Sequence, residues 1–300
     1  MSGEWFFPRD ALRDGAWESV VDHKVSDWRY TGLRIANLEA GTVELSATAV
    51  ERIVVPLNGA FSVTFRDAES ATLGTQKLNG RESVFSGPTD VLYLPTGTSA
   101  AITGSGRVAV AEAPSVAPRP VAYIPVGQVP VELRGAGRSS RQVHNFGTPG
   151  VLDADRLIVC EVITPAENWS SYPPHKHDEH HEGLESHLEE IYYFESAVSR
   201  GTSAPESAAP FGFMRTYASS TGDIDTLAEV HTGDIALVPY GWHGPCVAAP
   251  GYDLYYLNVM AGPDPERVWL IQDDPAHAWV RDTWIDQEID PRLPYSNSEK

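Results

Sequence analysis

Three histidines have the residue types and spacing of a metal site. His175 and His177 are separated by one residue in the segment YPPHKHDE of residues 172–179. Because alternate side chains of a β-strand lie on the same face, a His-x-His pair on a strand brings two imidazoles to one point. His243 ends the segment of residues 233–243, after an apolar run and a Pro/Gly turn, and offers a third imidazole. Neutral imidazoles suit Zn, Fe, Ni, Cu and Mn, and three of them with one carboxylate leave coordination positions open for a substrate.

The remaining histidines of the second half favour a simpler interpretation, that of solvated side chains. Eight of the ten histidines lie from residue 175 onward, so any imidazole chemistry belongs to that half. Residues 178–187 contain several of them but show no apolar period, which is typical of an exposed charged loop. We therefore expect solvated side chains at His180, His181 and His187.

Length, charge and cysteine content predict a soluble cytoplasmic protein without a membrane or nucleic-acid partner. The 300 residues, 42% of them apolar, are enough for two compact units. No stretch approaches the roughly 18 to 20 apolar residues of a membrane span, and the N-terminus lacks a secretory signal. The only two cysteines, Cys160 and Cys246, predict no disulfide framework and fit a reducing compartment. The net charge of −19 disfavours nucleic acid, because proteins that bind it display excess Lys and Arg.

Short β-branched and aromatic runs dominate the chain. Gly, Pro, Asn and Asp separate them at short intervals, which is typical of strands joined by tight turns. A helical stripe is limited to short possibilities near residues 10–22. The 25 Gly and 23 Pro suit the many corners of barrels or jelly rolls. We therefore predict an all-β fold with strands at residues 53–55, 60–65, 91–94, 108–111, 157–163, 191–194, 212–217, 235–238 and 254–260.

An internal repeat predicts that one β-fold occurs twice. Residues 90–99 (DVLYLPTGTS) and 234–243 (DIALVPYGWH) share the pattern Asp, four strand residues, Pro, any residue, Gly. In this register Ser99 takes the place of His243, and the first half contains no His-x-His pair. The N-terminal copy is therefore expected to lack the metal and to serve packing, assembly or one wall of the site.

The boundary between the two copies is expected within residues 113–150, which are rich in Pro and Gly. Strand-like residues 121–125 in this stretch predict that the link is ordered. We predict an N-terminal barrel without metal ligands over residues 1–128. A metal-binding barrel with the active site is predicted over residues 129–300.

The two histidine motifs resemble those of the cupin superfamily. The first gives His-x-His with a following Glu, and the second gives Gly-x5-Pro-x-Gly-x-His. With the duplication, the resemblance implies a bicupin of two tandem jelly-roll barrels. More narrowly, the chain resembles the 5-deoxy-glucuronate isomerase family of bacterial myo-inositol catabolism. The matching segments are residues 80–88 (GRESVFSGP), 141–145 (RQVHN), 168–178 (NWSSYPPHKHD), 188–193 (LEEIYY) and 251–263 (GYDLYYLNVMAGP).

The resemblance implies a carboxylate as the fourth ligand, and two glutamates are candidates. Generic cupin spacing points to Glu182, a few residues after the second histidine. The family pattern and the strand context point instead to Glu190, which runs directly into strand-like residues 191–194. Strand parity would turn Glu189 and Lys176 away from the metal. We therefore predict that one divalent ion, Zn, Mn or Fe, is bound by His175, His177, His243 and Glu190.

The resemblance also implies a reaction, the interconversion of 5-deoxy-glucuronate and 2-deoxy-5-keto-gluconate. This aldose-ketose isomerisation acidifies a C–H bond beside a carbonyl and forms an enediolate, and a chelated divalent cation assists both as a Lewis acid. A guanidinium is the natural partner of the substrate carboxylate; Arg215 is the first candidate and Arg141 the second. A general base must also move a proton between two carbons. The candidates for this base are Glu190, Tyr217, Tyr255 and Tyr256.

Two other function classes fit the same ligand set. Cupins with three histidines and one glutamate also bind Fe(II) and cleave substrates with O2, so a dioxygenase stays open. The third hypothesis is a sugar-acid-binding cupin without catalysis, although the chain shows no basic DNA-binding unit. Oxygen uptake during turnover would separate the first two, and metal-dependent turnover of a uronate would eliminate the third. The expected partner is a small uronate, and a homo-oligomer is compatible with the sequence.

Overall fold

The apolar runs of the sequence are β-strands in the computed structural model, which describes residues 4–67 and 73–296. All nine predicted strands are present, and three of them have the predicted bounds: Val91–Leu94, Gly212–Tyr217 and Ile235–Val238. The possible helix near residues 10–22 is wrong. Positive φ angles of 69° at Asp10 and 59° at Gly15 turn the chain there, and an α-helix requires negative φ throughout.

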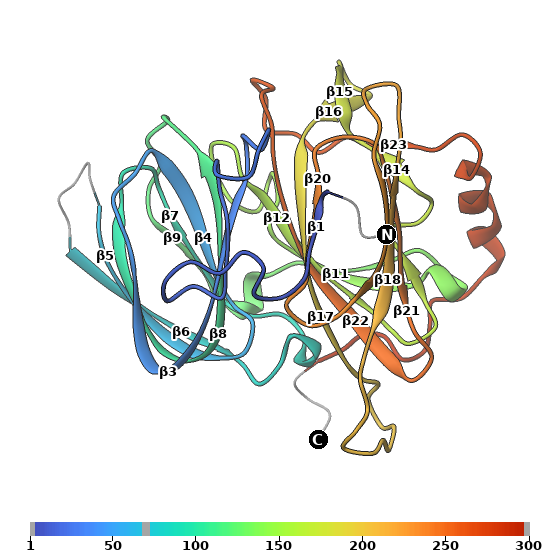
Figure 1. Cartoon of the computed structure of the whole chain (residues 1–300), viewed down its shortest axis with the longest axis horizontal. Helices are drawn as coiled ribbons and strands as arrows, with labels where there is room; N and C mark the ends of the chain where they lie inside the picture. The colour runs from blue at the N-terminus through green and yellow to red at the C-terminus, as the bar shows by residue number, and fades with distance from the viewer. Residues whose placement is uncertain (1–3, 68–72, 297–300) are drawn as a thin grey trace.

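One antiparallel sheet of the first half curls into a barrel, drawn in blue and cyan in Figure 1. Its interior is filled by apolar side chains such as Phe61, Val63 and Ile102. Arg52 and Glu112 form a buried ion pair of 2.7 Å beside this core. The strands are β2 (Ser19–Val21), β3 (Gly32–Leu45), β4 (Val50–Pro56), β5 (Gly59–Arg66), β6 (Leu73–Arg81), β7 (Val91–Leu94), β8 (Ser99–Pro114) and β9 (Ala122–Ile124).

Two sheets of the second half enclose the other barrel. The first has the order β1-β20-β17-β22-β12-β11-β10, and the second has the order β19-β18-β21-β14-β23, with β13 paired to β21. Their strands are β1 (Phe6–Phe7), β10 (Val131–Arg134), β11 (Arg141–Gly147), β12 (Ile158–Thr164), β13 (Trp169–Ser170), β14 (His175–Lys176), β17 (Glu189–Val198), β18 (Gly212–Tyr217), β19 (Asp225–Val230), β20 (Ile235–Val238), β21 (Trp242–Ala248), β22 (Tyr252–Ala261) and β23 (Gln272–Asp273).

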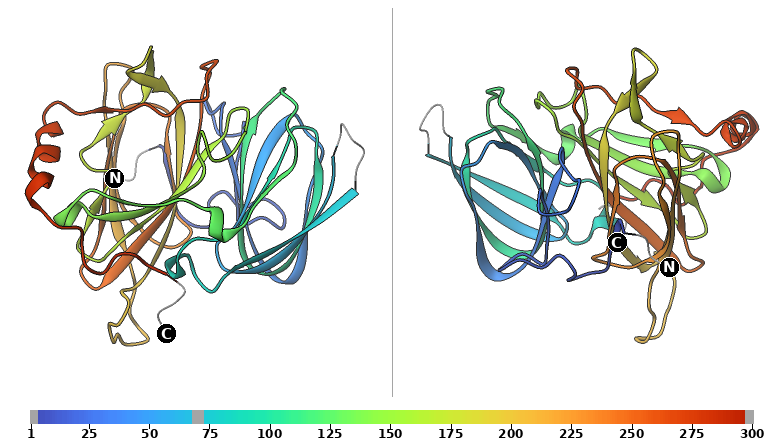
Figure 2. Two further views of the ribbon diagram at one scale, coloured as in Figure 1. Left: turned by 180° about the vertical axis from the view of Figure 1, so that it is seen from behind. Right: turned by 45° about the horizontal axis from the view of Figure 1, so that its top comes forward.

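Short elements decorate the second barrel. A hairpin of β15 (Asp178–His181) and β16 (Glu185–His187) projects from its top in Figure 1. The longest helical element is the 3-10 helix η4 (Ala278–Asp286), which lies on the side away from the first barrel (Figure 2). The other 3-10 turns of the described chain are η1 (Val84–Ser86), η2 (Val126–Gln128) and η3 (Gly137–Ser139).

The internal repeat has a physical basis in both barrels. β7 follows Asp90 and β20 follows Asp234, and both aspartates accept hydrogen bonds from backbone N–H groups. After each strand the chain turns at a glycine with positive φ, 78° at Gly97 and 98° at Gly241. Glycine adopts this conformation without steric cost. The shared pattern therefore encodes the same strand-turn unit twice, and the two copies of one β-fold predicted from it are confirmed.

A buried ion pair joins the two barrels. Arg81 of β6 donates hydrogen bonds of 2.7 and 2.6 Å to Glu161 of β12. His144 and Tyr255 contact the same carboxylate at 2.6 and 2.7 Å. Burial alone would raise the pKa of Glu161, but the charge of Arg81 and the hydrogen bond from His144 lower it to about 2. Arg81, from one segment of the family resemblance, therefore ties the first barrel to the second, and His144, from another segment, holds the Glu161 carboxylate from within the second barrel.

The two halves of the chain are not separate at their ends. β1 pairs with β20 of the second barrel, so the N-terminal segment crosses to that barrel before β2 begins. β9 pairs with β7, so the link is ordered around residues 122–124, as predicted. The division at residues 128 and 129 remains a proposal.

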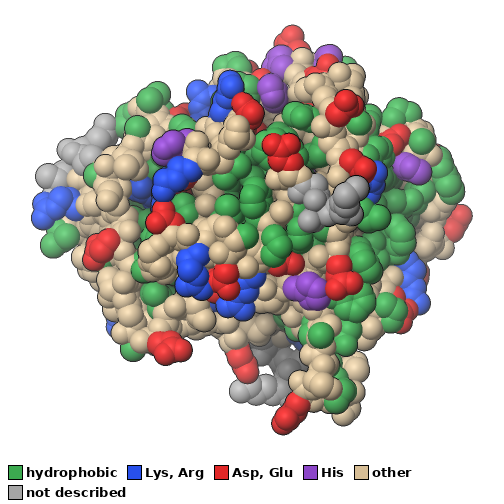
Figure 3. All heavy atoms as spheres, in the orientation of Figure 1, with side chains coloured by type: hydrophobic (Ala, Val, Ile, Leu, Met, Phe, Trp, Pro, Cys, Tyr) green, Lys and Arg blue, Asp and Glu red, His purple; other side chains and the backbone are tan. Residues whose placement is uncertain are grey.

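Both signs of charge are mixed on the face of the molecule shown in Figure 3, where Lys and Arg side chains lie among Asp and Glu. Both cysteines are buried and unpaired. In the described part of the chain, no helix has the length and apolar character needed to cross a membrane.

Candidate metal centre and cavity

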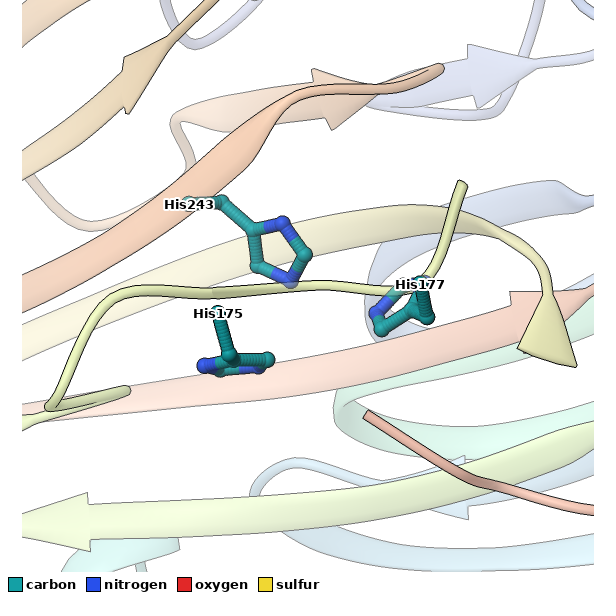
Figure 4. Close-up of side chains that lie close together, drawn as sticks. All are labelled: His175, His177 and His243. Carbon is teal, nitrogen blue, oxygen red and sulfur yellow. The ribbon is translucent and has the colours of Figure 1, made fainter. Parts of the chain in front are cut away.

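Three imidazoles meet inside the second barrel. The ligand atoms of His175, His177 and His243 all lie within 4.8 Å of one another. The ring centroid of His243 is 4.4 Å from that of His175 and 4.7 Å from that of His177, and Figure 4 shows the three rings grouped together. β14 ends at Lys176, because the chain then leaves the barrel to form the β15–β16 hairpin. His177 therefore follows the strand instead of lying on it, but its ring still reaches the same place.

Pairing and a charged cluster set the positions of the two histidine segments. His175 of β14 lies opposite His243 of β21 in the antiparallel register. Lys176 points away from the imidazoles, and its ammonium nitrogen lies 2.6 Å from a carboxylate oxygen of Asp178. Asp178 in turn accepts a hydrogen bond of 2.8 Å from the backbone N–H of Gly241. Lys176 and Asp178 thus connect the first histidine motif to the turn at Gly241, which precedes the third imidazole.

Glu190 is the carboxylate that the fold brings to the imidazoles. Its Oε2 lies 3.0 Å from Nε2 of His177 and 3.1 Å from Nε2 of His243. Glu189 faces the other way and accepts a hydrogen bond of 2.6 Å from the backbone N–H of Tyr30. Glu182 is exposed in the turn of the hairpin. The strand context, and not the generic spacing, therefore agrees with the observed arrangement.

The protonation states of His175 and Glu190 suit a divalent cation. Burial and the neighbouring imidazoles lower the pKa of His175 well below its usual value, which leaves a neutral imidazole with a free lone pair. Burial opposes ionisation of Glu190, but hydrogen bonds from His177 and His243 outweigh it and hold its pKa below the usual range. Imidazole nitrogens with a carboxylate oxygen are a common donor set for Zn, Mn and Fe. These four side chains could hold one ion.

A second group of possible ligands is already occupied by an ammonium. Within residues 4–67 and 73–296, the other group with metal-type side chains is Glu179, His181 and Glu185. Lys176 Nζ lies 2.8 Å from a carboxylate oxygen of both glutamates. A cation there would have to displace the Lys176 charge, so the imidazole cluster is the better candidate.

The imidazole cluster opens onto a cavity of about 190 Å³. His175 and Glu190 line one part of it. A volume below the roughly 300–1,000 Å³ of drug-sized pockets suits a small polar molecule. Three guanidinium groups also line the cavity, those of Arg134, Arg141 and Arg281. This is a large share of positive charge for an acidic protein.

Arg141 is the cavity arginine without an acidic partner among the described residues. Arg134 pairs with Glu132 and Arg281 pairs with Asp273, each at 2.7 Å. The buried guanidinium of Arg141 donates one hydrogen bond of 3.0 Å to a backbone oxygen, that of Ser139. Burial, with the charges of Arg134 and Arg281, lowers the pKa of Arg141 to about 10, so it stays charged near neutrality. A buried cation without a counterion is a strong site for a carboxylate.

Neutral polar groups occupy the middle of the cavity. The Ser171 hydroxyl lies 3.2 Å from the Tyr192 hydroxyl and 3.3 Å from the Tyr256 hydroxyl. The side-chain amide nitrogen of Asn258 and the indole nitrogen of Trp269 are buried donors without a hydrogen-bond partner in the described structure. Buried donors are normally satisfied, so these two indicate a polar ligand.

Three of the predicted site residues lie outside this cavity. On β18, Met214 and Thr216 are buried, whereas Arg215 and Tyr217 alternate with them and point outward. Arg215 pairs with Asp225, and the Tyr217 hydroxyl donates to Asp274.

Tyr255 also faces away from the cavity, because its hydroxyl donates to Glu161 between the barrels. Its neighbour Tyr256 lies on the opposite face of β22 and lines the cavity. Of the predicted residues beyond the four candidate ligands, the fold therefore brings Arg141 and Tyr256 to the site.

The model of the KduI/IolB family matches residues 6–280 of the chain. The chain belongs to this family. A curated relative, the 5-deoxy-glucuronate isomerase of Geobacillus thermodenitrificans (strain NG80-2), is 38% identical over 266 residues, which cover 88% of this chain and 90% of the relative. The protein of the same name from Bacillus subtilis (strain 168) is 36% identical over 259 residues, which cover 85% of this chain and 89% of the relative.

Solved structures agree with this assignment. An IolB-like protein from Salmonella typhimurium LT2 superposes with a TM-score of 0.80 at 34% identity, and the match covers 92% of this chain and 98% of that protein. The oxalate decarboxylase of Lactobacillus farciminis superposes with a TM-score of 0.58 at 11% identity, covering 85% of this chain and 82% of the decarboxylase. At that identity the likeness shows the shared fold alone.

Two substitutions would separate the glutamates as ligands in this member of the KduI/IolB family. We expect Glu190→Gln to lower metal affinity or activity at least about tenfold, because an amide oxygen is a weaker donor than a carboxylate. Glu182→Gln should be nearly silent, since this side chain is exposed in the hairpin turn. Isothermal titration with a divalent ion, alongside steady-state kinetics, measures both variants. A large effect at Glu182 with none at Glu190 would show that generic motif spacing decides the ligand.

The sequence interpretation missed several cavity residues. Strand parity could have found Tyr192 and Asn258, since Tyr192 lies two residues after Glu190 and Asn258 two residues after Tyr256. Arg134 and Arg281 carry no motif, because β10 and η4 reach the cavity only through tertiary packing.

Proposed function

We propose that the protein interconverts 5-deoxy-D-glucuronate and 2-deoxy-5-keto-D-gluconate, a step of myo-inositol degradation. One observation carries the proposal: a single cavity combines a donor set for a divalent ion with the buried, unpaired guanidinium of Arg141. The substrate named by the curated relatives carries an aldehyde at one end and a carboxylate at the other. The two charged features of the cavity match these two ends.

The proposed cofactor is one divalent ion, Zn, Mn or Fe. When bound, the ion supplies Lewis-acid chemistry that acidifies the C–H bond beside the carbonyl and stabilises the charge that develops on oxygen. The residues that would hold it are His175, His177, His243 and Glu190.

The remaining roles belong to side chains of the cavity. Arg141 binds the carboxylate and so orients the substrate. Glu190, if its carboxylate swings off the ion, is placed to take the proton from the hydroxyl-bearing carbon and to return it to the former aldehyde carbon. Burial raises the pKa of Tyr256, so its hydroxyl stays protonated and donates a hydrogen bond to a substrate oxygen. A proton must also pass from one substrate oxygen to the other, and the contacts of Ser171 with Tyr192 and Tyr256 offer a path.

Tyr217 and Tyr255 do not face the cavity, unlike Glu190. Each hydroxyl donates to a carboxylate outside the cavity, Asp274 and Glu161 respectively. Burial raises the pKa of both phenols, so neither group would be a base near neutral pH. We therefore assign the proton transfer to Glu190.

Isomerisation in D2O tests the proton transfer. A base that exchanges with solvent should leave deuterium at the carbon that gains hydrogen, which 1H NMR of the product detects. We expect partial to full incorporation with the wild-type protein. Complete absence of deuterium would favour an intramolecular hydride shift or a base shielded from exchange, and the role of Glu190 as a proton carrier that exchanges with solvent would then be withdrawn.

We propose different roles for the two barrels. Residues 129–300 would carry the metal centre and the active site, and residues 1–128 would lack metal ligands. Action in the cytoplasm, no nucleic-acid partner and a possible homo-oligomer remain predictions from the sequence.

A further inference from the structure

We propose that Val143 and Val162 select substrates with a methylene group next to the carboxylate. The inference rests on the proposed function and deepens it, because it names the part of the substrate by which the cavity distinguishes one sugar acid from another. Both side chains are buried and line the cavity. They lie between the arginines and the polar half of the cavity, as the strand register shows.

The register of the first sheet gives the order of the wall residues. Arg134 of β10 lies opposite Arg141 of β11. Val143 follows Arg141 by two residues, so both side chains lie on the cavity face. Val143 lies opposite Val162 of β12, and Val162 lies opposite Tyr256 of β22. From the edge strand β10 toward β22, the cavity wall is therefore first charged, then apolar, then polar.

The polar part continues toward the metal centre. On β22, Asn258 follows Tyr256 by two residues and lies opposite Tyr192 of β17. Tyr192 follows Glu190 by two residues on the same strand. The Asn258 amide nitrogen is one of the buried donors without a partner in the described chain. Hydroxyl and amide groups thus fill the space between the valines and Glu190.

The order of groups on the wall matches the order of groups in the proposed substrate. From one end, 5-deoxy-glucuronate has a carboxylate, a methylene carbon, three hydroxyl-bearing carbons and an aldehyde. With the carboxylate on Arg141 and the aldehyde near Glu190, the methylene carbon falls beside Val143 and Val162. The hydroxyl-bearing carbons then fall beside Tyr256, Asn258 and other polar groups.

A hydroxyl on the carbon next to the carboxylate would be buried against the two valines. Loss of its hydrogen bonds to water would not be compensated, which disfavours its binding. Apolar pockets reject an added hydroxyl by about 10²-fold in kcat/KM. D-glucuronate, which differs from the proposed substrate by this hydroxyl, should therefore be a poor substrate.

The test compares kcat/KM for 5-deoxy-glucuronate and D-glucuronate in the wild type, Val143→Thr and Val162→Thr. Threonine keeps the shape of valine and adds a hydrogen-bonding group. The matched control is Val247→Thr, because Val247 lies on the outer face of β21, away from the cavity. The two sugars differ in their fraction of open-chain form. That factor is a property of the sugar and cancels when the selectivity of a variant is divided by that of the wild type.

We expect the preference for the deoxy sugar to fall about tenfold in Val143→Thr, in Val162→Thr or in both, and to stay unchanged in Val247→Thr. A fall in one variant alone supports the proposal and identifies the closer valine. Unchanged selectivity in both cavity variants, with metal content and thermal unfolding like those of the wild type, would overturn it. If a threonine variant unfolds, the other variant decides. Failure of the wild type to isomerise 5-deoxy-glucuronate would instead overturn the proposed function.

Discussion

Replacing His243 by Ala should remove the bound ion and lower kcat by about 10³-fold or more. His243 lies within 4.8 Å of both other imidazoles, and its loss leaves a smaller donor set that binds a divalent ion weakly. Lewis-acid assistance contributes several kcal/mol to such a reaction, and each 1.36 kcal/mol corresponds to a factor of ten in rate. Metal analysis by mass spectrometry and a steady-state isomerase assay measure the two effects.

His181→Ala is the control for this experiment. His181 is exposed in the β15–β16 hairpin, so we expect wild-type metal content and wild-type rates. Circular dichroism should show an intact β-fold in both variants, because apolar strands form the barrel core. Retention of a full equivalent of metal by His243→Ala, or its loss from His181→Ala, would contradict the proposed ligand set.

Replacing Arg141 by Met should lower kcat/KM for 5-deoxy-glucuronate by about 10²- to 10³-fold, mainly through a raised KM. Truncation of one partner of a buried, hydrogen-bonded charge pair costs about 2–5 kcal/mol. Methionine keeps much of the side-chain volume and removes the charge. Metal content should not change, because Arg141 is not among the proposed ligands. Steady-state kinetics with the metal-loaded protein measure the effect.

Arg215→Met is the matched control for the carboxylate anchor. Arg215 pairs with Asp225 on the outer face of β18, so its removal should leave KM near the wild-type value. The opposite result, a raised KM in Arg215→Met and wild-type kinetics in Arg141→Met, would show that the carboxylate binds elsewhere.

The sequence was sufficient for the elements that depend on local patterns. Apolar runs bounded by Gly and Pro predicted the strands, and the repeated Asp-strand-Pro-x-Gly pattern predicted two copies of one barrel. Strand context selected Glu190 over Glu182, which agrees with the geometry, since Glu190 lies on β17 beside two imidazoles. These predictions agree with the structure because strand periodicity and turn chemistry are encoded over a few residues.

The predictions for Tyr255 and Arg215 depended on which face of their strand points into the cavity. Tyr255 and Tyr256 are adjacent aromatic residues on a strand buried on both faces, so hydrophobicity does not show which of them enters the cavity. Arg215 and Arg141 differ through tertiary contacts: Asp225 on the neighbouring strand neutralises Arg215, whereas Arg141 is buried without such a partner among the described residues. A single sequence carries no signal for either distinction.

One metal-dependent site is proposed to carry out the isomerisation. The most direct test is 1H NMR of 5-deoxy-glucuronate under anaerobic conditions, with protein stripped of metal by a chelator and with the same protein reloaded with Mn, Zn or Fe(II). We predict conversion to 2-deoxy-5-keto-gluconate by the reloaded protein without O2 or nicotinamide, at close to one bound ion per chain, and none by the stripped protein. A strict requirement for O2, or equal turnover by the stripped protein, would contradict the account.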